Sequence, residues 1–104
     1  MIITTTETVP GRDIAELLGV ARGSTVRARN VGRDIFAGFK NIVGGEISEY
    51  TKLQAESREQ AMQRMMEDAQ ALGADAVINV GLTTSMVTQG AAEILAYGTA
   101  VKLK

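Results

Sequence analysis

The chain has 104 residues, a formal net charge of −1 at pH 7, two Tyr, two Phe and no Trp, Cys or His. This length predicts one domain over residues 1–104, and so few large side chains predict a thin core that burial between subunits would complete. The missing Cys and His exclude disulfides, thiolate catalysis and the usual soft-metal ligands, and the charge balance argues against nucleic-acid binding.

The chain opens with β-branched residues and no charged segment before an apolar run, so we expect no signal peptide. No apolar run approaches the roughly 20 residues that cross a bilayer as a helix. We therefore expect a cytoplasmic protein with no membrane partner.

Residues 2–6 are β-branched and predict a short edge strand, which a turn at residues 8–11 follows. Two interpretations compete for the next segment. Apolar residues between positions 14 and 18 have helical spacing, but Gly19 and Gly23 would interrupt a helix. Alternation from position 20 to 29 favours an extended strand, bent at one of these glycines.

A short helix is predicted over residues 32–43, because apolar side chains recur there at intervals of three and four. Gly44 and Gly45 would end it and allow the chain to enter the next helix. The apolar residues of this segment are Ile35, Phe36, Phe39, Ile42 and Val43.

A long amphipathic helix is predicted over residues 46–72, followed by Gly73 in the left-handed position and by a strand over residues 75–84. Its polar face carries Lys52, Glu56, Glu59, Gln63 and Glu67. Its apolar stripe consists of Ile47, Tyr50, Ala61, Met62, Met65, Ala69 and Leu72. Arg58 projects near the middle of that stripe, where a buried guanidinium needs a partner.

The C-terminal segment alternates as a strand over residues 91–104, after a hairpin bend at Gly90. One of its faces is nearly smooth, with Ala96, Gly98 and Ala100, so that the long helix or another subunit can approach closely. The other face carries Glu93 and Tyr97, among larger residues.

These residues supply a candidate cluster for ligand binding or for structure, made of Arg58, Glu93, Tyr97 and Glu46. We predict that Arg58 pairs with Glu93, either inside the subunit or across an interface. A satisfied structural pair without a ligand is the favoured interpretation. An acid–base cluster, with the carboxyl group perturbed by burial, is the alternative.

Three motifs carry a resemblance to a known family: Gly44-Gly45-Glu46-Ile47, Ala71-Leu72-Gly73-Ala74-Asp75-Ala76-Val77 and Ala96-Tyr97-Gly98-Thr99-Ala100-Val101. Together they resemble the YbjQ-like family of small, mostly bacterial proteins that are labelled as heavy-metal-binding. The resemblance covers essentially the whole chain and implies a β-α-β-β core similar to the dodecin subunit, with the helix on an antiparallel sheet. It also implies a ring-forming homo-oligomer, a pentamer or decamer, and no established activity.

The chain departs from this family where many relatives have an Arg and an acidic residue after the buried strand, because it has Gly81 and Thr83. Its composition also bears on the metal label. Soft metals prefer thiolate and imidazole, whereas the oxygen ligands of this chain suit Mg²⁺ or Ca²⁺ better. The candidate oxygen ligands are Glu46, Glu49, Asp75 and Glu93.

The sequence therefore favours a small α+β oligomeric protein that acts as a binding module or scaffold, with a small ligand or a metal as its cargo, and not as an enzyme. The alternative is an enzyme of unknown reaction that uses Arg58, Glu93 and Tyr97. A protein-interaction module and nucleic-acid binding by an Arg-rich strand are further options with weaker support. That strand and its surroundings carry Arg22, Arg27, Arg29 and Arg33.

Overall fold

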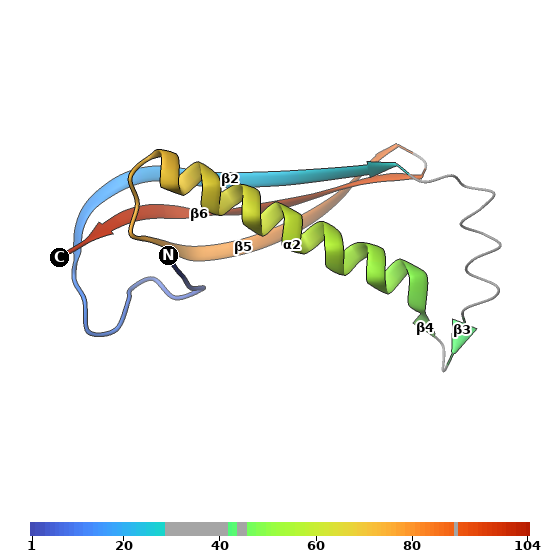
Figure 1. Cartoon of the computed structure of the whole chain (residues 1–104), viewed down its shortest axis with the longest axis horizontal. Helices are drawn as coiled ribbons and strands as arrows, with labels where there is room; N and C mark the ends of the chain where they lie inside the picture. The colour runs from blue at the N-terminus through green and yellow to red at the C-terminus, as the bar shows by residue number, and fades with distance from the viewer. Residues whose placement is uncertain (29–41, 44–45, 89) are drawn as a thin grey trace.

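The computed structural model describes residues 1–28, 42–43, 46–88 and 90–104. In this part of the chain one long helix lies on one face of a four-stranded sheet with the order β1-β5-β6-β2 (Figure 1). Strand β1 runs parallel to β5, and the other pairs are antiparallel, which confirms the α+β class and its β-α-β-β core. The elements are β1 (Ile2–Ile3), β2 (Ile14–Ala28), β3 (Ile42–Val43), β4 (Glu46–Ile47), α2 (Ser48–Ala71), β5 (Ala76–Thr88) and β6 (Ala91–Leu103).

Strand β2 is longer than the predicted strand, because it begins at Ile14 and not near position 20. The helical interpretation of residues 14–18 is therefore wrong. The predicted bend is present at Gly19, which has a φ of +123° and lies at a shift in the pairing register with β6. The shift lets one strand incorporate both the apolar segment and the alternating segment.

The helix predicted over residues 32–43 falls mainly on residues 29–41, which lie outside the described residues. For the last two residues of that segment the helix prediction is wrong, because Ile42–Val43 forms β3 and pairs antiparallel with Glu46–Ile47. The long helix accordingly begins at Ser48 and not at position 46. β-Branched residues at 42, 43 and 47 favour the extended conformation that both short strands adopt.

The C-terminal end of α2 has the predicted glycine cap. Gly73 has a φ of +82°, and its N–H donates to the Gln70 carbonyl at 2.9 Å. The Ala74 N–H donates to the Ala69 carbonyl at 3.1 Å. These two bonds form a Schellman motif, which satisfies carbonyls at the end of the helix and turns the chain directly into β5.

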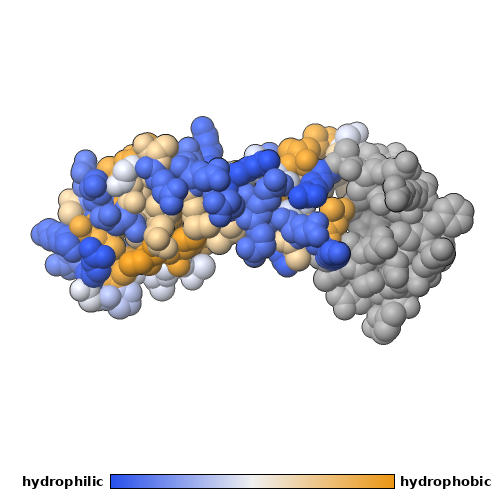
Figure 2. Space-filling model, in the orientation of Figure 1, coloured by the Kyte–Doolittle hydropathy of each residue, from blue (hydrophilic) through white to orange (hydrophobic). Residues whose placement is uncertain are grey.

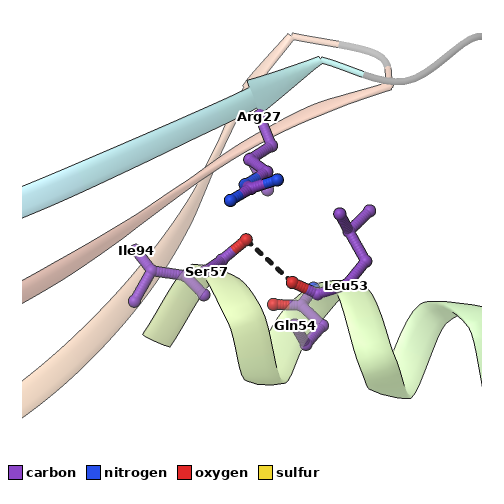
Figure 3. A pocket seen from close by; sticks show the side chains of 6 residues that line it. Arg27, Leu53, Gln54, Ser57 and Ile94 are labelled. Carbon is purple, nitrogen blue, oxygen red and sulfur yellow. Dashed lines mark hydrogen bonds between the residues drawn. The ribbon is translucent and has the colours of Figure 1, made fainter. Parts of the chain in front are cut away.

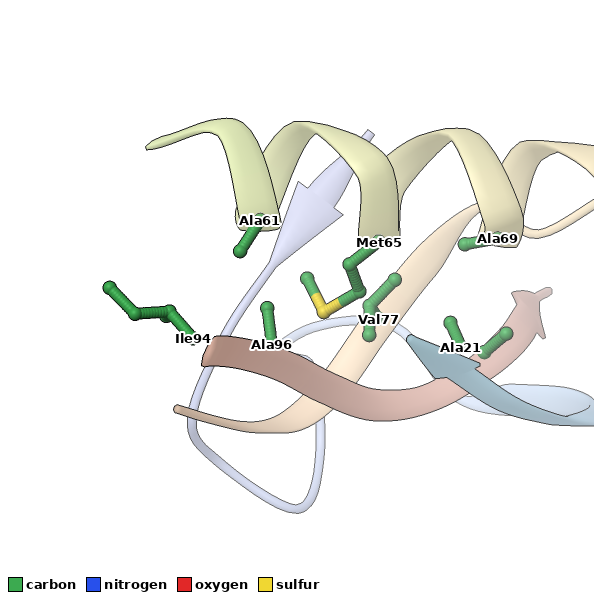
Figure 4. Close-up of a cluster of buried hydrophobic side chains, with 8 residues drawn as sticks. Ala21, Ala61, Met65, Ala69, Val77, Ile94 and Ala96 are labelled. Atoms are coloured by element: carbon green, nitrogen blue, oxygen red, sulfur yellow. The ribbon is translucent and has the colours of Figure 1, made fainter. Parts of the chain in front are cut away.

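The main core lies between α2 and the sheet, where Ala61, Met65 and Ala69 of the helix are fully buried (Figure 4). They pack on the smooth strand face that the sequence predicted, so the close partner of Ala96 and Ala100 is the helix. The sheet side of this core consists of Ala21, Val77, Ile94, Ala96 and Ala100. Small side chains on both layers let the helix approach the strands closely.

A second, smaller cluster lies on the opposite face of the sheet. Val9, in the loop before β2, is 8% exposed and packs with Val101 and Leu103 of β6. Ala76 and Ile78 of β5 complete this cluster. The N-terminal loop therefore covers only one end of the face that the helix leaves open (Figure 1).

Figure 2 shows the helix side of the molecule, where hydrophilic residues form a band in the middle of the view and hydrophobic residues lie beside it. All five residues of the predicted polar face of the helix are exposed. Within the described residues, no helix has the length and apolarity needed to cross a membrane.

Candidate functional site

A hollow opens beside the N-terminal half of α2, between the helix and the distal ends of the strands (Figure 3). Its inner part is a cavity of about 10 Å³, roughly the space of one water molecule, lined by Arg27, Leu53, Gln54, Ser57, Ala92 and Ile94. Its outer part has a volume of about 330 Å³ and is lined by Gln54, Thr84, Met86, Gly90, Ala91 and Ala92. Gln54 and Ala92 line both parts, so the two parts lie next to each other.

Arg27 and Ser57 of this lining, with Thr25 next to it, determine the polar chemistry of the inner cavity. Nη2 of Arg27 donates a hydrogen bond to Oε1 of Gln60 on the helix at 3.2 Å. The hydroxyl of Ser57, which is 4% exposed, donates to the Leu53 carbonyl at 2.9 Å. Thr25 is 3% exposed, and its Oγ1 has no hydrogen-bond partner among the residues that the structure describes. Thr25 lies directly opposite Ile94, a residue that lines the cavity.

This arrangement suits binding better than covalent chemistry. A guanidinium, an amide and a hydroxyl line a mostly apolar hollow, so they can orient a small polar or anionic group through hydrogen bonds. Among the described residues that line it, no carboxylate or imidazole is placed to act as a general base. The volume of the outer part falls in the range of roughly 300–1,000 Å³ that is typical of small-molecule sites.

The predicted cluster does not assemble within one subunit. Arg58 is exposed on α2 and does not lie in the buried stripe, which runs along Ser57, Ala61 and Met65 at intervals of four. Arg58 follows Ser57 by one residue and therefore lies about 100° from it around the helix axis, outside the buried stripe. Among the described residues, Arg27 of β2 directs its guanidinium toward the space between helix and sheet (Figure 3).

Glu93 and Tyr97 point away from the helix, because they alternate with Ile94 and Ala96, which face it. A pair between Arg58 and Glu93 inside the subunit is therefore wrong, since the sheet separates them. Their pairing across an interface stays a prediction. The backbone of Glu46 belongs to β4, and its side chain lies outside the described residues.

Sequence reasoning missed the role of Arg27, although the signal was present. Thr25 and Arg27 alternate on one side of β2, and Gly23 precedes them on the same side. A glycine in a strand lets a helix pack closely against it, so the face on which the glycine lies is the buried face. Polar residues that follow on the same face are therefore candidates for the site.

Tyr97 lies over Gly81, its partner across the β5–β6 ladder. A Cβ at Gly81 would be 2.6 Å from the phenol oxygen of Tyr97 and 2.7 Å from Cζ. The ring of Tyr97 therefore occupies the space that a side chain at position 81 would need.

We expect Gly81→Val to destabilise the protein by less than about 1 kcal/mol, because the partly exposed ring of Tyr97 can turn aside toward solvent. Denaturant unfolding at equal protomer concentration measures the effect. The same change in a Tyr97→Ala background is the control, and there the cost should shrink. Equal costs in both backgrounds would show that the ring is not the obstacle.

A family model described as "Putative heavy-metal-binding" matches residues 1–104. The chain belongs to the YbjQ family. It is 62% identical over 104 residues to a UPF0145 protein of Archaeoglobus fulgidus, a match that covers 100% of this chain and 96% of that relative.

Other relatives of this YbjQ-family chain extend the comparison to bacteria. A UPF0145 protein of Vibrio campbellii is 57% identical over 103 residues, with 99% of each chain covered. The family therefore occurs in archaea as well, so the mostly bacterial origin implied by the sequence resemblance is too narrow. A solved protein of unknown function from Pediococcus pentosaceus, of the DUF74 family, has the same fold, with a TM-score of 0.66, 18% identity, and coverage of 100% of this chain and 98% of that one.

The donor atoms of this YbjQ-family protein do not fit the heavy metal in the family description. The chain has neither Cys nor His, the residues that bind soft metals. Across the described ranges, no three carboxylates come close enough together to hold an ion. The hollow beside α2 offers a cation, Arg27, which would repel a metal ion and attract an anion.

Proposed function

We propose that this protein is a homo-oligomeric binding scaffold of the cytoplasm, built as a pentamer or decamer, and not an enzyme. One observation carries the proposal: the sheet face opposite α2 exposes large apolar side chains beyond the part covered by the N-terminal loop. Leu17 is 71% exposed, Val20 67% and Val26 57%, and Tyr97 on the neighbouring strand is 41% exposed. Arg22 and Ser24 lie between Val20 and Val26 on this face, so the apolar side chains form separate patches within a mixed surface. Exposed apolar patches with a polar surround are a feature of interaction sites.

The register of the strands supports this proposal. Leu17, Val20 and Val26 lie directly opposite Val101, Thr99 and Glu93 of β6, so all of them share the face that points away from α2. Packing a second copy there would add apolar burial that this thin core lacks. A ring of subunits leaves no such face open to water, because each copy covers its neighbour.

The hollow beside α2 supplies the binding function of this proposal. It lies on the helix side of the sheet, whereas the apolar face lies on the other side. Assembly through the apolar face therefore leaves the hollow accessible. Its polar groups support reversible capture of a small polar or anionic molecule, and the lack of a general base in its described lining supports a role without catalysis.

Native mass spectrometry of the protein as purified tests the assembly. We expect multiples of the subunit mass, with a pentamer or a decamer dominant. Val20→Lys puts a charge on the apolar face and should reduce the mass to no more than a dimer. Leu72→Lys is the matched control, because Leu72 is 42% exposed at the end of α2, away from that face, and its variant should keep the native mass. A monomeric natural protein, or an unchanged mass for Val20→Lys, would contradict the proposal.

A further inference from the structure

A row of three residues crosses the sheet along the floor of the hollow beside α2. Arg27 of β2 lies opposite Ala92 of β6, and Ala92 lies opposite Met86 of β5. All three residues line the hollow. Because neighbouring strands are about 4.8 Å apart, the two ends of the row are roughly 10 Å apart at their Cα atoms. The row therefore has a cationic end, a small residue in its middle and a flexible apolar end.

The cationic end of this row can accept an anion. Arg27 is half-buried, and its Nη2 donates to the neutral amide oxygen of Gln60 at 3.2 Å. That bond uses one of the five N–H donors of the guanidinium. Among the described residues that line the hollow, none carries a carboxylate that would compete for the remaining donors. A guanidinium with reduced hydration favours a partner of opposite charge, which a ligand can supply here.

The size of the inner cavity favours a carboxylate over a phosphate. Its volume of about 10 Å³ holds one oxygen atom with the size of a water molecule. One oxygen of a carboxylate can enter and meet Arg27 and the side-chain amide of Gln54, which both line this part. Ser57 is not available as a donor, because its hydroxyl already donates to the Leu53 carbonyl. A phosphate group carries up to about two negative charges and three acceptor oxygens, which match neither this volume nor one guanidinium.

The outer part of the hollow can accept the apolar body of the same molecule. Its volume of about 330 Å³ is far larger than that of the inner cavity, and its lining includes Ala91, Ala92 and Met86. Met86 is 81% exposed, so a ligand that packs against it removes apolar surface from water. The thioether side chain is also flexible and adapts to the shape of a ligand. Ala92 lines both parts, and its small side chain leaves space for a ligand that extends from one part into the other.

We propose that the hollow binds a small monocarboxylate, with the carboxylate at Arg27 and the apolar body over Ala92 and against Met86. The inference rests on the binding role in the proposed function and deepens it, because it names the class of ligand and its orientation. Arg27 supplies the charge and Gln54 a second hydrogen bond, whereas Ala92 and Met86 select for the apolar body. The length of the row suits a short-chain fatty acid or an aromatic carboxylate.

Isothermal titration calorimetry of the natural protein with sodium hexanoate tests the inference, and displacement titrations measure the weaker ligands. We expect saturable binding of hexanoate. Hexanamide has the same apolar body without the charge and should bind roughly tenfold more weakly, or less. Acetate has the charge without the body and should also bind at least roughly tenfold more weakly. Inorganic phosphate represents the other class of anion and should not displace hexanoate.

Two variants separate the contacts of the carboxylate from those of the apolar body. Arg27→Gln should abolish the preference for hexanoate over hexanamide, because the charge-assisted hydrogen bond is lost. Met86→Ala should reduce the preference for hexanoate over acetate, because it removes apolar contact with the body alone. Arg22→Gln is the matched control for charge. Arg22 is exposed on the same strand but on the face that points away from α2, so this variant should bind hexanoate as the natural protein does.

Denaturant unfolding checks that these variants keep the stability of the natural protein. Equal affinities for hexanoate and hexanamide, or a loss of hexanoate binding in Arg22→Gln and not in Arg27→Gln, would overturn the inference. Phosphate binding that depends on Arg27, without binding of hexanoate, would overturn the ligand class and leave the binding scaffold intact. A monomeric natural protein that binds hexanoate through Arg27 would contradict the proposed assembly and support the inference, because the hollow lies within one subunit.

Discussion

Gly23→Ala should destabilise the protein more than a substitution at any other described glycine. A Cβ at this position would be 2.6 Å from the carbonyl oxygen of Ala61, and it would collide with the backbone nitrogen of Met65. The obstacle is helix backbone, which cannot rotate away as a side chain can. The helix must therefore lift from β2, and we expect a loss at or above the upper end of about 1–3 kcal/mol in the free energy of unfolding.

Denaturant unfolding at equal protomer concentration measures this loss, with Ser24→Ala as the matched control on the same strand. The main-chain carbonyl of Ser24 still accepts from Arg64 in that variant, so its cost should stay within about 0.5 kcal/mol. Because the clash involves backbone, shortening Met65 should not rescue Gly23→Ala. A rescue, or a cost like that of the control, would show that the helix is not held as closely as described.

Met65→Ala should produce the second large effect. Met65 is fully buried and is among the largest side chains buried to this degree, in a core otherwise rich in alanine. Its truncation leaves a cavity that neighbouring alanines cannot fill, so we expect a loss of about 2–5 kcal/mol.

Met65→Leu is the control for this prediction, because it nearly conserves volume and should cost less than about 1.5 kcal/mol. Thermal and denaturant unfolding of the two variants, again at one protomer concentration, give the comparison. Equal stabilities would mean that the α2–sheet layer can collapse around the missing atoms, which its close-packed alanines argue against.

The sequence predicted the elements that have a strong local signal. Gly73 and the alternation after it located the end of the helix and the start of β5, because a left-handed cap and a buried strand each impose their own residue types. The small residues of β6 predicted a close neighbour, and Met65 and Ala69 of α2 provide it.

The candidate site was harder to predict, because it depends on how the layers are oriented. A shift of one position around the helix moved Arg58 to the surface and placed Ser57 in the buried stripe. Which face of β2 meets the helix is likewise a tertiary property, so alternation alone could not identify Arg27 as the guanidinium beside the hollow. The short strands β3 and β4 form by pairing with each other. Each has too few residues for a hydrophobic pattern to distinguish a strand from a helix.

The pairing of β2 with β6 has a consequence for the order of folding. Ile14 lies opposite Leu103, so this ladder joins the two ends of the chain and requires the closure of a very long loop. The β5–β6 hairpin is local and pays a much smaller closure entropy, so we expect it to form first. Strand β2 and helix α2 then complete the structure together, because the contact at Gly23 needs both. Until they arrive, β6 has an open edge of its own, and the nascent chain is most prone to aggregation in that interval.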